Sequence, residues 1–483
     1  MVKDKKLSVL FVASECFPLI KTGGLADVVG ALPLALSHID VETTIFLPGF
    51  PDVLSGLKSK KTLAKIKSLN GKPAKVISGR TATGLSVLAL DAPDLFGFNG
   101  NPYLTDEGYD RPLNGEKFAT FSKIGVEIAK GQIGEKQYDI LHAHDWQAGL
   151  CAAYLRAAND TRVKTVLTIH NLAFQGLFPK SLMDSLELPH DYFSAEGFEY
   201  WDKVSFLKAA IAFSDHVTTV SPSYALEIQS DEGGMGFGGL LRAKTDRLSG
   251  ILNGIDLEVW NPATDPKITH NFTANMPDGK VQNKQGLQKL LGLRQVADAP
   301  LFTVISRLTT QKGLDLLADM TDFIVAQGGQ LALLGSGDVA IEGAFKDAAK
   351  KHPTEISVTI GYDEPFAHRL QAGADAIFIP SRFEPCGLTQ LCAMRYGTVP
   401  IVGRVGGLND TIIDANPMAL ASGAATGVQF SPINSHMLYS AISRTFDLYN
   451  SPKHWNRLVE NCLNQNVGWA ESAQTYKDLY SSL

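Results

Sequence analysis

Short apolar runs, each followed by a glycine-bearing turn and a helical segment, recur along most of this chain and restrict its fold more than any other feature. Leu7–Ser14 is the first such run, and it leads through the loop Glu15–Gly24 into an apolar helical stretch. Runs of this kind are typical of strands buried on both faces of a parallel sheet, because crossover helices cover both faces. Further strands are predicted at Thr43–Leu47, Ser86–Leu90, Tyr138–Ala143, Thr165–Ile169 and His216–Val220, with helices at Lys117–Lys130 and Trp146–Ala158.

A second series of the same pattern begins at Leu301–Ser306 and continues with a predicted helix over Gly313–Gln327. Later strands are predicted at Gln330–Leu334, Ser357–Ile360, Ala376–Ile379 and Val399–Val402, and Tyr439–Leu483 is predicted to be helical. The alternation predicts an α/β chain with two doubly wound domains and mainly parallel sheets. In such sheets, ligands bind at the carboxyl ends of the strands.

Turn-forming residues separate the two series. A chain of 483 residues is too long for a single hydrophobic core. Gly254–Asp265 is rich in turn formers, and we place the inter-domain connection near Asn253–Pro262. We therefore predict a first domain over residues 1–256, a second over 257–465, and a final helix over 466–483 that packs back on the first domain.

Charge and cysteine usage restrict the partners and the compartment. The net charge of −6 gives no support for binding to nucleic acid or to an anionic membrane, and no apolar run approaches the length of a membrane span. The lysines within Met1–Lys6 superficially resemble the start of a signal peptide, but the short run after them reads as the first strand. The five cysteines are scattered and lack C-x-x-C spacing. These features predict a cytoplasmic protein without disulfides or a zinc site.

A carboxylate follows one of the buried strands of the second series. The segment Pro380–Gln390 lies between the strand Ala376–Ile379 and a helix predicted from Leu391. Gly387 allows the backbone to approach a ligand closely, and the amides near it point outward at a helix N-terminus. Glu384 can accept hydrogen bonds from sugar hydroxyls while these amides donate others. The alternative is a capping loop with a solvated glutamate.

Cations accompany the first turn of each series. Arg307 and Lys312 flank a turn directly after the first strand of the second series, which suits a diphosphate. Lys21 precedes paired glycines, of which Gly24 opens the first helix, where the helix dipole favours an anion. Exposed turn cations are the alternative in both places. Neither segment matches the P-loop pattern G-x-x-x-x-G-K-[ST].

A histidine-rich segment ends one predicted strand. His142, His144 and Asp145 stand together there, and such a group can suggest a metal site, although no further ligand is near in the sequence. Asp145 acting only as the N-cap of the next helix is a simpler alternative. His170 ends the following predicted strand, so we expect it to converge with Asp145 at one sheet edge. There it can contact a substrate hydroxyl or serve only as a structural hydrogen-bonding residue.

Three further segments contain candidate ligand-binding residues. Tyr362 follows a strand of the second series and is compatible with stacking on a nucleobase or with ordinary packing. Tyr103 lies in the predicted loop Asp94–Gly115 and can touch a sugar acceptor. Gly406 and Gly407 can offer backbone amides to a phosphate. No G-x-S-x-G elbow or Ser-His-Asp order appears, so acyl transfer is unsupported.

The ordered set of motifs resembles a known family across about residues 7–480. The motifs are Lys21–Val28, His142–Gln147, Thr168–Asn171, Asn253–Asp256, Ser306–Leu308, Gln311–Gly313 and Pro380–Gln390. Together they resemble those of bacterial glycogen synthases and the related plant starch synthases. The resemblance implies a GT-B fold, in which two Rossmann-like domains with parallel sheets face a deep inter-domain cleft and close during catalysis.

The same resemblance implies a hexosyltransferase that moves glucose from ADP-glucose to the non-reducing end of an α-1,4-glucan such as glycogen. It implies retention of the anomeric configuration and no metal or other cofactor. It assigns catalytic roles to Lys21, His170, Arg307, Lys312 and Glu384. It assigns donor binding to Gly24, Asp27, Asp145, Asn171, Asn253, Gln311, Tyr362, Cys386, Gly387, Leu388 and Thr389. Tyr103 is the expected acceptor contact.

One departure separates this chain from other retaining transferases of the same fold. Many of these carry a second glutamate eight positions after the first, whereas this chain has Cys392 there. That difference favours the glycogen and starch synthases over the sucrose and trehalose-phosphate synthases. Cys386 lies in the sugar loop, so its position predicts inhibition by thiol reagents. The alternatives are a retaining transferase that uses another nucleotide sugar and a catalytically inactive glucan-binding protein.

Overall fold

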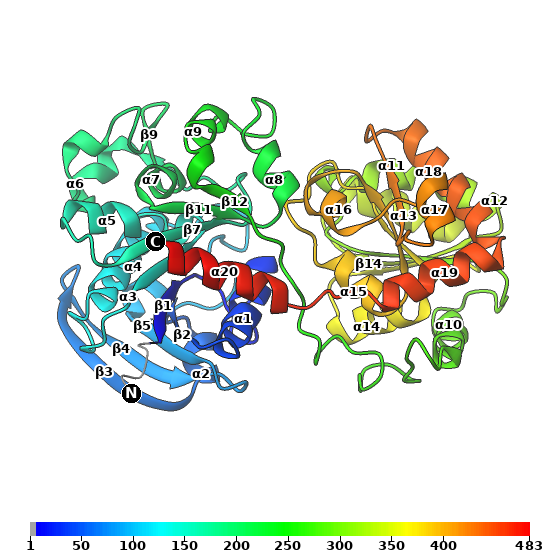
Figure 1. Ribbon diagram of the computed structural model, residues 1–483, viewed down its shortest axis with the longest axis horizontal. Helices are drawn as coiled ribbons and strands as arrows, with labels where there is room; N and C mark the ends of the chain where they lie inside the picture. The colour runs from blue at the N-terminus through cyan, green and yellow to red at the C-terminus, as the bar shows by residue number, and fades with distance from the viewer. Residues whose placement is uncertain (1–5) are drawn as a thin grey trace. The chain divides into compact units, whose positions relative to one another are not determined.

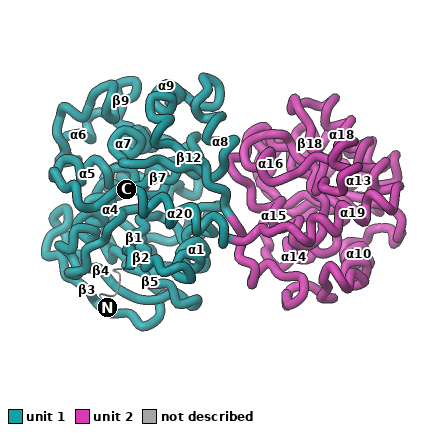
Figure 2. Tube along the Cα trace, viewed as in Figure 1, with its two compact units in different colours: residues 1–253, 469–483 teal, residues 254–468 magenta. Residues whose placement is uncertain are grey.

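The computed structural model describes residues 6–483, and the lysine-containing segment 1–5 that superficially resembles a signal peptide lies outside the described residues. Figure 2 shows two compact units. Unit 1 comprises the chain up to Asn253 together with Trp469–Leu483, and unit 2 comprises Gly254–Gly468. No helix among residues 6–483 is both long enough and apolar enough to cross a membrane.

Unit 1 contains a mainly parallel sheet with helices on its faces (Figure 1). Within the described part, nine strands lie in the order β12-β11-β7-β6-β1-β2-β5-β4-β3, and β4 alone runs antiparallel to its neighbours β5 and β3. The strands are β1 (Leu7–Val12), β2 (Val41–Pro48), β3 (Lys58–Leu69), β4 (Lys72–Arg80), β5 (Ser86–Asp91), β6 (Ile140–His144), β7 (Lys164–Ile169), β11 (His216–Thr219) and β12 (Leu248–Gly250). The residues of β1 and β6 are almost entirely buried, as expected for central parallel strands.

Helices and a small second sheet complete unit 1. The helices are α1 (Gly24–Ser37), α2 (Pro51–Gly56), α3 (Pro93–Phe96), α4 (Asn114–Ala129), α5 (Cys151–Ala157), α6 (Met183–Leu186), α7 (Phe206–Phe213), α8 (Pro222–Glu227), α9 (Gly238–Arg242) and α20 (Ala470–Ser482). The small sheet has the order β8-β10-β9, with β8 (Leu177–Pro179), β9 (Glu199–Tyr200) and β10 (Lys203–Ser205). The predicted helix 146–158 is wrong as a single element, because a short 3₁₀ turn, Trp146–Ala148, precedes α5.

The last helix of the chain belongs to unit 1. Helix α20, drawn in red in Figure 1, packs against α1. The Lys477 ammonium donates to the Ile39 carbonyl over 2.8 Å, and the Ser472 hydroxyl donates to the Leu252 carbonyl over 2.5 Å. Tyr480 lies 2.7 Å from His142 of β6, so α20 also reaches a central strand of the sheet.

Unit 2 contains a parallel sheet with the strand order β15-β14-β13-β16-β17-β18, six strands in all among its described residues. The strands are β13 (Leu301–Ile305), β14 (Gln330–Gly335), β15 (Ile356–Ile360), β16 (Ala376–Ile379), β17 (Val399–Gly403) and β18 (Val428–Phe430). The helices are α10 (Asp278–Leu290), α11 (Leu314–Ala318), α12 (Thr321–Ala326), α13 (Val339–Lys351), α14 (Glu364–Gly373), α15 (Thr389–Arg395), α16 (Gly406–Thr411), α17 (Pro417–Ser422), α18 (Ser435–Tyr449) and α19 (Pro452–Leu463). The predicted helix 313–327 is divided into α11 and α12.

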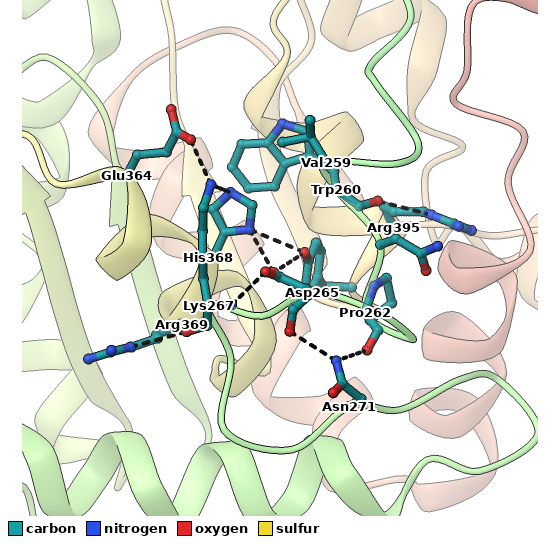
Figure 3. A network of polar contacts seen from close by, with 12 residues as sticks. Val259, Trp260, Pro262, Asp265, Lys267, Asn271, Glu364, His368, Arg369 and Arg395 are labelled. Atoms are coloured by element: carbon teal, nitrogen blue, oxygen red, sulfur yellow. Dashed lines mark hydrogen bonds and ion pairs between the residues drawn. The ribbon is translucent and has the colours of Figure 1, made fainter. Parts of the chain in front are cut away.

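A buried polar network holds the segment 259–271 against α14 in unit 2 (Figure 3). Asp265 accepts hydrogen bonds from His368 Nδ1 over 2.7 Å and from the Tyr396 hydroxyl over 2.5 Å. Lys267 Nζ lies 3.1 Å from His368 Nε2 and 2.7 Å from the Glu364 carboxylate. Because the ammonium only donates, His368 accepts at Nε2 and carries its proton on Nδ1.

Candidate functional site

The expected cation and carboxylate of unit 2 meet at the carboxyl edge of its sheet. Lys312 ends the 3₁₀ turn Thr310–Lys312 after β13, and Glu384 lies in the loop after β16. Their Nζ and Oε2 atoms are 2.5 Å apart, and both side chains are mostly buried. Ser381 also donates to Glu384 Oε2 over 2.9 Å. The carboxylate is therefore held in place by two donors at the edge where parallel sheets bind ligands.

Close backbone contacts bring these two loops together. Gly313 has φ +67°, and a Cβ there would lie 2.0 Å from the Pro380 carbonyl oxygen, so only glycine fits. The Arg382 guanidinium donates to both carboxylate oxygens of Asp315, over 2.7 and 2.8 Å. It also donates to the Thr310 carbonyl over 2.6 Å. The loop after β16 is thus fastened to the turn after β13, which fixes the Lys312–Glu384 geometry.

Arg307 differs from Arg382 although both follow strands of the same sheet. Its side chain is exposed, and its guanidinium has no hydrogen bond or ion pair with the residues from 6 to 483. A guanidinium without an acidic partner among the described residues, in the same loop after β13 as Lys312, is suited to an anion such as a diphosphate.

The glycines at the start of α16 support the Glu384 loop instead of a phosphate. The Gly407 N–H donates to the carbonyl oxygens of Glu384 and Pro385, each over 3.1 Å. A Cβ on Gly406 would lie 2.1 Å from the Glu384 carbonyl oxygen. The prediction that Gly407 offers its amide to a phosphate is therefore wrong, because this donor is already used within the protein.

The segment Cys386–Thr389 forms the start of α15. Gly387 has φ +71°, and the Gln390 amide donates to the carbonyls of Cys386 and Gly387 over 3.0 and 2.8 Å. Leu388 is the N-cap residue of α15, and its side chain provides no capping hydrogen bond. The Cys386 thiol is buried, so thiol reagents have little access to it in this structure. Cys392, in α15, is also buried.

Two other donor-binding candidates lie at this edge of unit 2. The Gln311 amide donates to the Phe383 carbonyl over 3.4 Å, so it braces the Glu384 loop. Tyr362 lies in the turn between β15 and α14, and 66% of its surface is exposed. An exposed ring is accessible to a nucleobase, as the sequence-based hypothesis requires.

In unit 1, the expected anion site is the start of α1. Helix α1 begins at Gly24, and its N-cap Gly23 contributes no side-chain hydrogen bond. Lys21 Nζ lies 2.7 Å from the Asp27 carboxylate, and both side chains are about one-third exposed. Lys21 is therefore accessible, but binding an anion there requires it to share or exchange this carboxylate partner.

Glu15 is a site residue that the sequence analysis did not identify. Its buried carboxylate accepts hydrogen bonds from the Thr22 backbone N–H and the Thr22 hydroxyl, both over 2.5 Å, and from the Gly23 N–H over 3.3 Å. The glycine turn before α1 is thus shaped by a carboxylate of the protein itself. The only sequence signal was an acidic residue in the loop after the first strand.

Tyr103 also contacts this carboxylate. Its hydroxyl donates to Glu15 Oε1 over 2.6 Å and lies 2.6 Å from the Ser14 hydroxyl. Burial, and then the nearby negative charge of Glu15, raise the pKa of Tyr103 well above its usual value. The structure places Tyr103 at the carboxyl end of β1, where its hydroxyl is engaged by the protein.

Asp145 and His170 lie together at the carboxyl ends of β6 and β7. The Asp145 carboxylate accepts from the His170 backbone N–H over 2.7 Å. Its side chain makes no capping bond to the turn that follows it, so the alternative in which Asp145 acts only as a side-chain N-cap is wrong. Asp145 has φ +53°, and this backbone turns its side chain toward the end of β7. Burial raises the pKa of Asp145 to about 7, and the His170 and Asn171 amides oppose the shift.

The three histidines of this edge are connected by hydrogen bonds and stacking. His144 Nδ1 lies 2.9 Å from His170 Nε2, and the His142 and His144 rings stack with centroids 4.3 Å apart. His142 contacts the Tyr480 and Thr168 hydroxyls over 2.7 and 2.6 Å. Burial lowers the pKa of His142 and of His170 to about 3, and it lowers the pKa of His144 well below its usual value. All three imidazoles are therefore neutral near pH 7.

The remaining donor-binding candidates of unit 1 are two asparagines. Asn171 Oδ1 accepts from the Ala173 N–H over 3.0 Å, which shapes the turn after β7. Asn253 is buried, and its Oδ1 has no hydrogen-bond partner among the described residues. Between residues 6 and 483, no group of three or more His, Cys, Asp or Glu side chains is arranged to hold a metal ion.

Comparison with protein families gives two matches along the chain. Residues 8–243 match the family described as the starch synthase catalytic domain, and residues 293–461 match the glycosyl transferases group 1. The chain is 49% identical to a glycogen synthase of Rhodopseudomonas palustris, over 99% of this chain and 98% of the relative. It is 51% identical to a glycogen synthase of Methylocella silvestris, over 99% of both chains.

Solved structures show the same fold. The catalytic domain of starch synthase IV from Arabidopsis thaliana, bound to ADP and acarbose, superposes with a TM-score of 0.90 and is 33% identical, covering 99% of both chains. A sucrose-phosphate synthase from Thermosynechococcus elongatus has a TM-score of 0.61 at 17% identity and covers 99% of this chain and 100% of its own. The second similarity concerns the fold alone.

Proposed function

Because this chain belongs to the family of glycogen and starch synthases and is a glycosyltransferase, we propose that it transfers glucose from ADP-glucose to the non-reducing end of an α-1,4-glucan. Retention of the anomeric configuration is part of the proposal, as is a cytoplasmic location. The relatives named glycogen synthase support the polymer as acceptor, and the starch synthase bound to ADP and acarbose supports an adenine nucleotide and a glucan as ligands.

The observation that carries the proposal is the arrangement of Arg307, Lys312 and Glu384 at one edge of unit 2. Lys312 is 2.5 Å from Glu384, while the Arg307 guanidinium remains exposed and without a protein partner among residues 6–483. An exposed guanidinium and a fixed ammonium in one loop after the same strand offer two positive charges for a diphosphate. A buried, fixed carboxylate is complementary to sugar hydroxyls.

These charges also account for catalysis. When the bond from glucose to the diphosphate breaks, negative charge grows on the leaving oxygen and positive charge grows on the sugar ring. Arg307 and Lys312 then interact more strongly with the leaving group than they do with the bound substrate, which lowers the barrier. We propose that the acceptor hydroxyl enters on the face from which the diphosphate departs, and that the diphosphate takes its proton. Glu384 positions the glucosyl group in this proposal.

The remaining roles, in both units, are those that the family implies for these residues. Lys21 exchanges part of its contact with Asp27 for the diphosphate, next to the Gly24 amide at the start of α1. Asp145, His170 and Asn171 contact the glucosyl group, and the unpaired Oδ1 of Asn253 accepts a hydrogen bond from the donor. Tyr362 stacks on the adenine. Gln311 and the segment Cys386–Thr389 surround the donor, and Tyr103 lies next to the acceptor.

Transfer of labelled glucose onto glycogen tests the proposal directly. ADP-glucose and UDP-glucose are supplied in parallel, each in the presence of EDTA. Incorporation from ADP-glucose alone supports the reaction, the donor and the independence from metal ions together. Incorporation from UDP-glucose would replace the donor assignment, and glucan binding without incorporation from either donor would favour a catalytically inactive glucan-binding protein.

A further inference from the structure

The contact between His144 and His170 restricts the chemistry of both rings. His144 Nδ1 and His170 Nε2 are 2.9 Å apart, a normal hydrogen-bond distance. A neutral imidazole has one donor nitrogen and one acceptor nitrogen, so one of these two atoms must carry a proton and the other must not. The tautomer of His170 is therefore coupled to the tautomer of His144.

The surroundings of His144 favour the tautomer in which its Nδ1, and not its Nε2, carries the proton. Its side chain is fully buried, and its Nε2 has no hydrogen-bond partner among the described residues. If Nε2 carried the proton, a buried N–H donor would remain unsatisfied, and orphaned buried N–H groups are rarer than under-satisfied acceptors. If Nδ1 carries the proton, only a lone pair on Nε2 remains without a partner.

The neighbouring rings keep His144 in this position. Phe11 stacks on one side with ring centroids 5.2 Å apart, and His142 stacks with centroids 4.3 Å apart. His142 is fixed in turn by the hydroxyls of Thr168 and Tyr480, over 2.6 and 2.7 Å. The His144 ring is thus held directly by β1 and β6 and, through His142, by α20, and among residues 6–483 it forms no hydrogen bond with a carboxylate.

We propose that His144 is a positioning residue that donates its Nδ1–H to His170 Nε2 and thereby fixes His170 as the Nδ1–H tautomer. His170 then presents a hydrogen-bond donor, not an acceptor, on its remaining nitrogen. This step rests on the proposed function, in which His170 contacts the glucosyl group. A donor there complements a sugar hydroxyl oxygen, whereas the other tautomer would offer only a lone pair.

Nitrogen NMR of protein labelled with ¹⁵N-histidine tests the tautomer without any substrate. Two-bond and three-bond couplings from the ring protons identify the protonated nitrogen of each histidine, and the His170→Gln variant assigns the His170 signals. His368 is the internal standard, because Asp265 and Lys267 require its proton on Nδ1. His170 as the Nδ1–H tautomer supports the inference, and His170 as the Nε2–H tautomer overturns it.

Two substitutions at His144 add a functional measurement. In H144N the side-chain amide keeps an N–H donor near the position of Nδ1, so we expect His170 to remain the Nδ1–H tautomer and kcat to stay near the wild-type value. In H144A the donor is lost, so we expect a mixture of His170 tautomers and a fall in kcat of about tenfold, with a smaller change in KM for ADP-glucose. Equal kcat values in the two variants would contradict the inference.

The two measurements also separate this inference from the proposed function. If wild-type protein shows the Nδ1–H tautomer but transfers no glucose from any donor, the proposed function fails and the tautomer assignment stands. If transfer is normal but His170 carries its proton on Nε2, the function stands and the positioning role of His144 fails.

Discussion

The two units each bury histidines in a polar network, but they satisfy them differently. In unit 2, the Asp265 carboxylate accepts from His368 and Tyr396, and Lys267 donates to the other nitrogen of His368 (Figure 3). In unit 1, the only hydrogen bond of the His144 side chain among the described residues is to another imidazole, and its other ring nitrogen has no hydrogen-bond partner there. The first network is closed and includes a charge, whereas the second is neutral and open.

This difference separates structure from function in physical terms. A closed network lowers the free energy of the folded state, because every buried donor has an acceptor. A group without a partner among residues 6–483, such as Asn253 Oδ1 or the Arg307 guanidinium, costs stability or contributes none. Such groups are suited to a ligand that supplies the missing partner. Substitutions in the closed network should therefore change stability, and substitutions at the open positions should change activity.

The largest effect is expected from Asp265→Asn. The amide cannot accept from every donor that now contacts the carboxylate, so the free energy of unfolding of unit 2 should fall by about 3–5 kcal/mol. Urea unfolding followed by unit-specific fluorescence measures this change. Asp256→Asn is the matched control, because Asp256 accepts only from the backbone of its own turn. Equal stability of D265N and D256N would contradict the idea that the closed network around Asp265 stabilises unit 2.

The next effect is a loss of activity without a loss of stability. Arg307→Ala removes an exposed guanidinium, so kcat/KM for ADP-glucose should fall on the order of 100- to 1000-fold, about 2.7–4 kcal/mol. The melting temperature should not change. Arg369→Ala, which also removes an exposed arginine from unit 2, should leave kcat/KM unchanged. An R307A enzyme with wild-type kcat/KM would remove Arg307 from the proposed site.

The next prediction concerns how the stability of unit 1 depends on pH through Asp145. The pKa of Asp145 is raised from 3.8 to about 7, so the folded protein binds this proton more tightly than the unfolded chain does. The stabilisation that this proton gives the folded state is complete below about pH 4 and is lost as the pH rises to 7. The free energy of unfolding falls over this range by at most about 1.4 kcal/mol per pH unit. Asp145→Asn removes this loss, so D145N should gain stability relative to wild type between pH 4 and pH 7.

The buried histidines of unit 1 change the free energy of unfolding with pH in the opposite direction. The pKa values of His142 and His170 are lowered from 6.5 to about 3, so their contribution is complete above pH 6.5 and is lost as the pH falls toward 3. Comparison of D145N with wild type at each pH cancels this second effect. A stability difference that does not vary with pH would contradict the raised pKa of Asp145.

The smallest effect concerns a single hydroxyl. Tyr396→Phe removes the donor 2.5 Å from Asp265 and should lower the free energy of unfolding by about 1.5 kcal/mol, with little change in activity. Tyr103→Phe removes the hydroxyl that donates to Glu15 at the edge of the unit 1 sheet, so it should also lower glucan transfer. Thermal unfolding and the transfer assay separate these outcomes. Similar activity losses in Y396F and Y103F would remove the distinction between the two regions.

The apolar alternation was sufficient to predict the fold class because central parallel strands are buried on both faces. It did not predict the hairpin of β3 and β4, whose residues are lysine-rich and mostly exposed. β3 is an edge strand, where exposed lysines are common, and β4 joins it to β5, so neither strand needs an apolar run. Helix α10 was missed because it buries Lys284 and Gln288, whose partners are in distant parts of the chain.

The site residues, too, could be predicted only where the position of a residue in the sheet topology determines its neighbours. Arg307, Lys312 and Glu384 were predicted as a group because each directly follows a strand of a parallel sheet, where topology alone brings residues together. Glu15 was not predicted, because its role depends on Tyr103, which is far away in the sequence and reaches it through an irregular loop. The coupling of His144 to His170 depends on ring positions that no sequence pattern specifies.

The path of the chain has a consequence for the order in which the protein can fold during synthesis. Because α20 belongs to unit 1, the ribosome produces all of residues 254–468 before it produces the last helix of the first unit. Domains generally fold as they emerge, so unit 2 can complete its core while unit 1 still lacks Tyr480. The contact between His142 and Tyr480 can therefore form only after all of unit 2 has been synthesised.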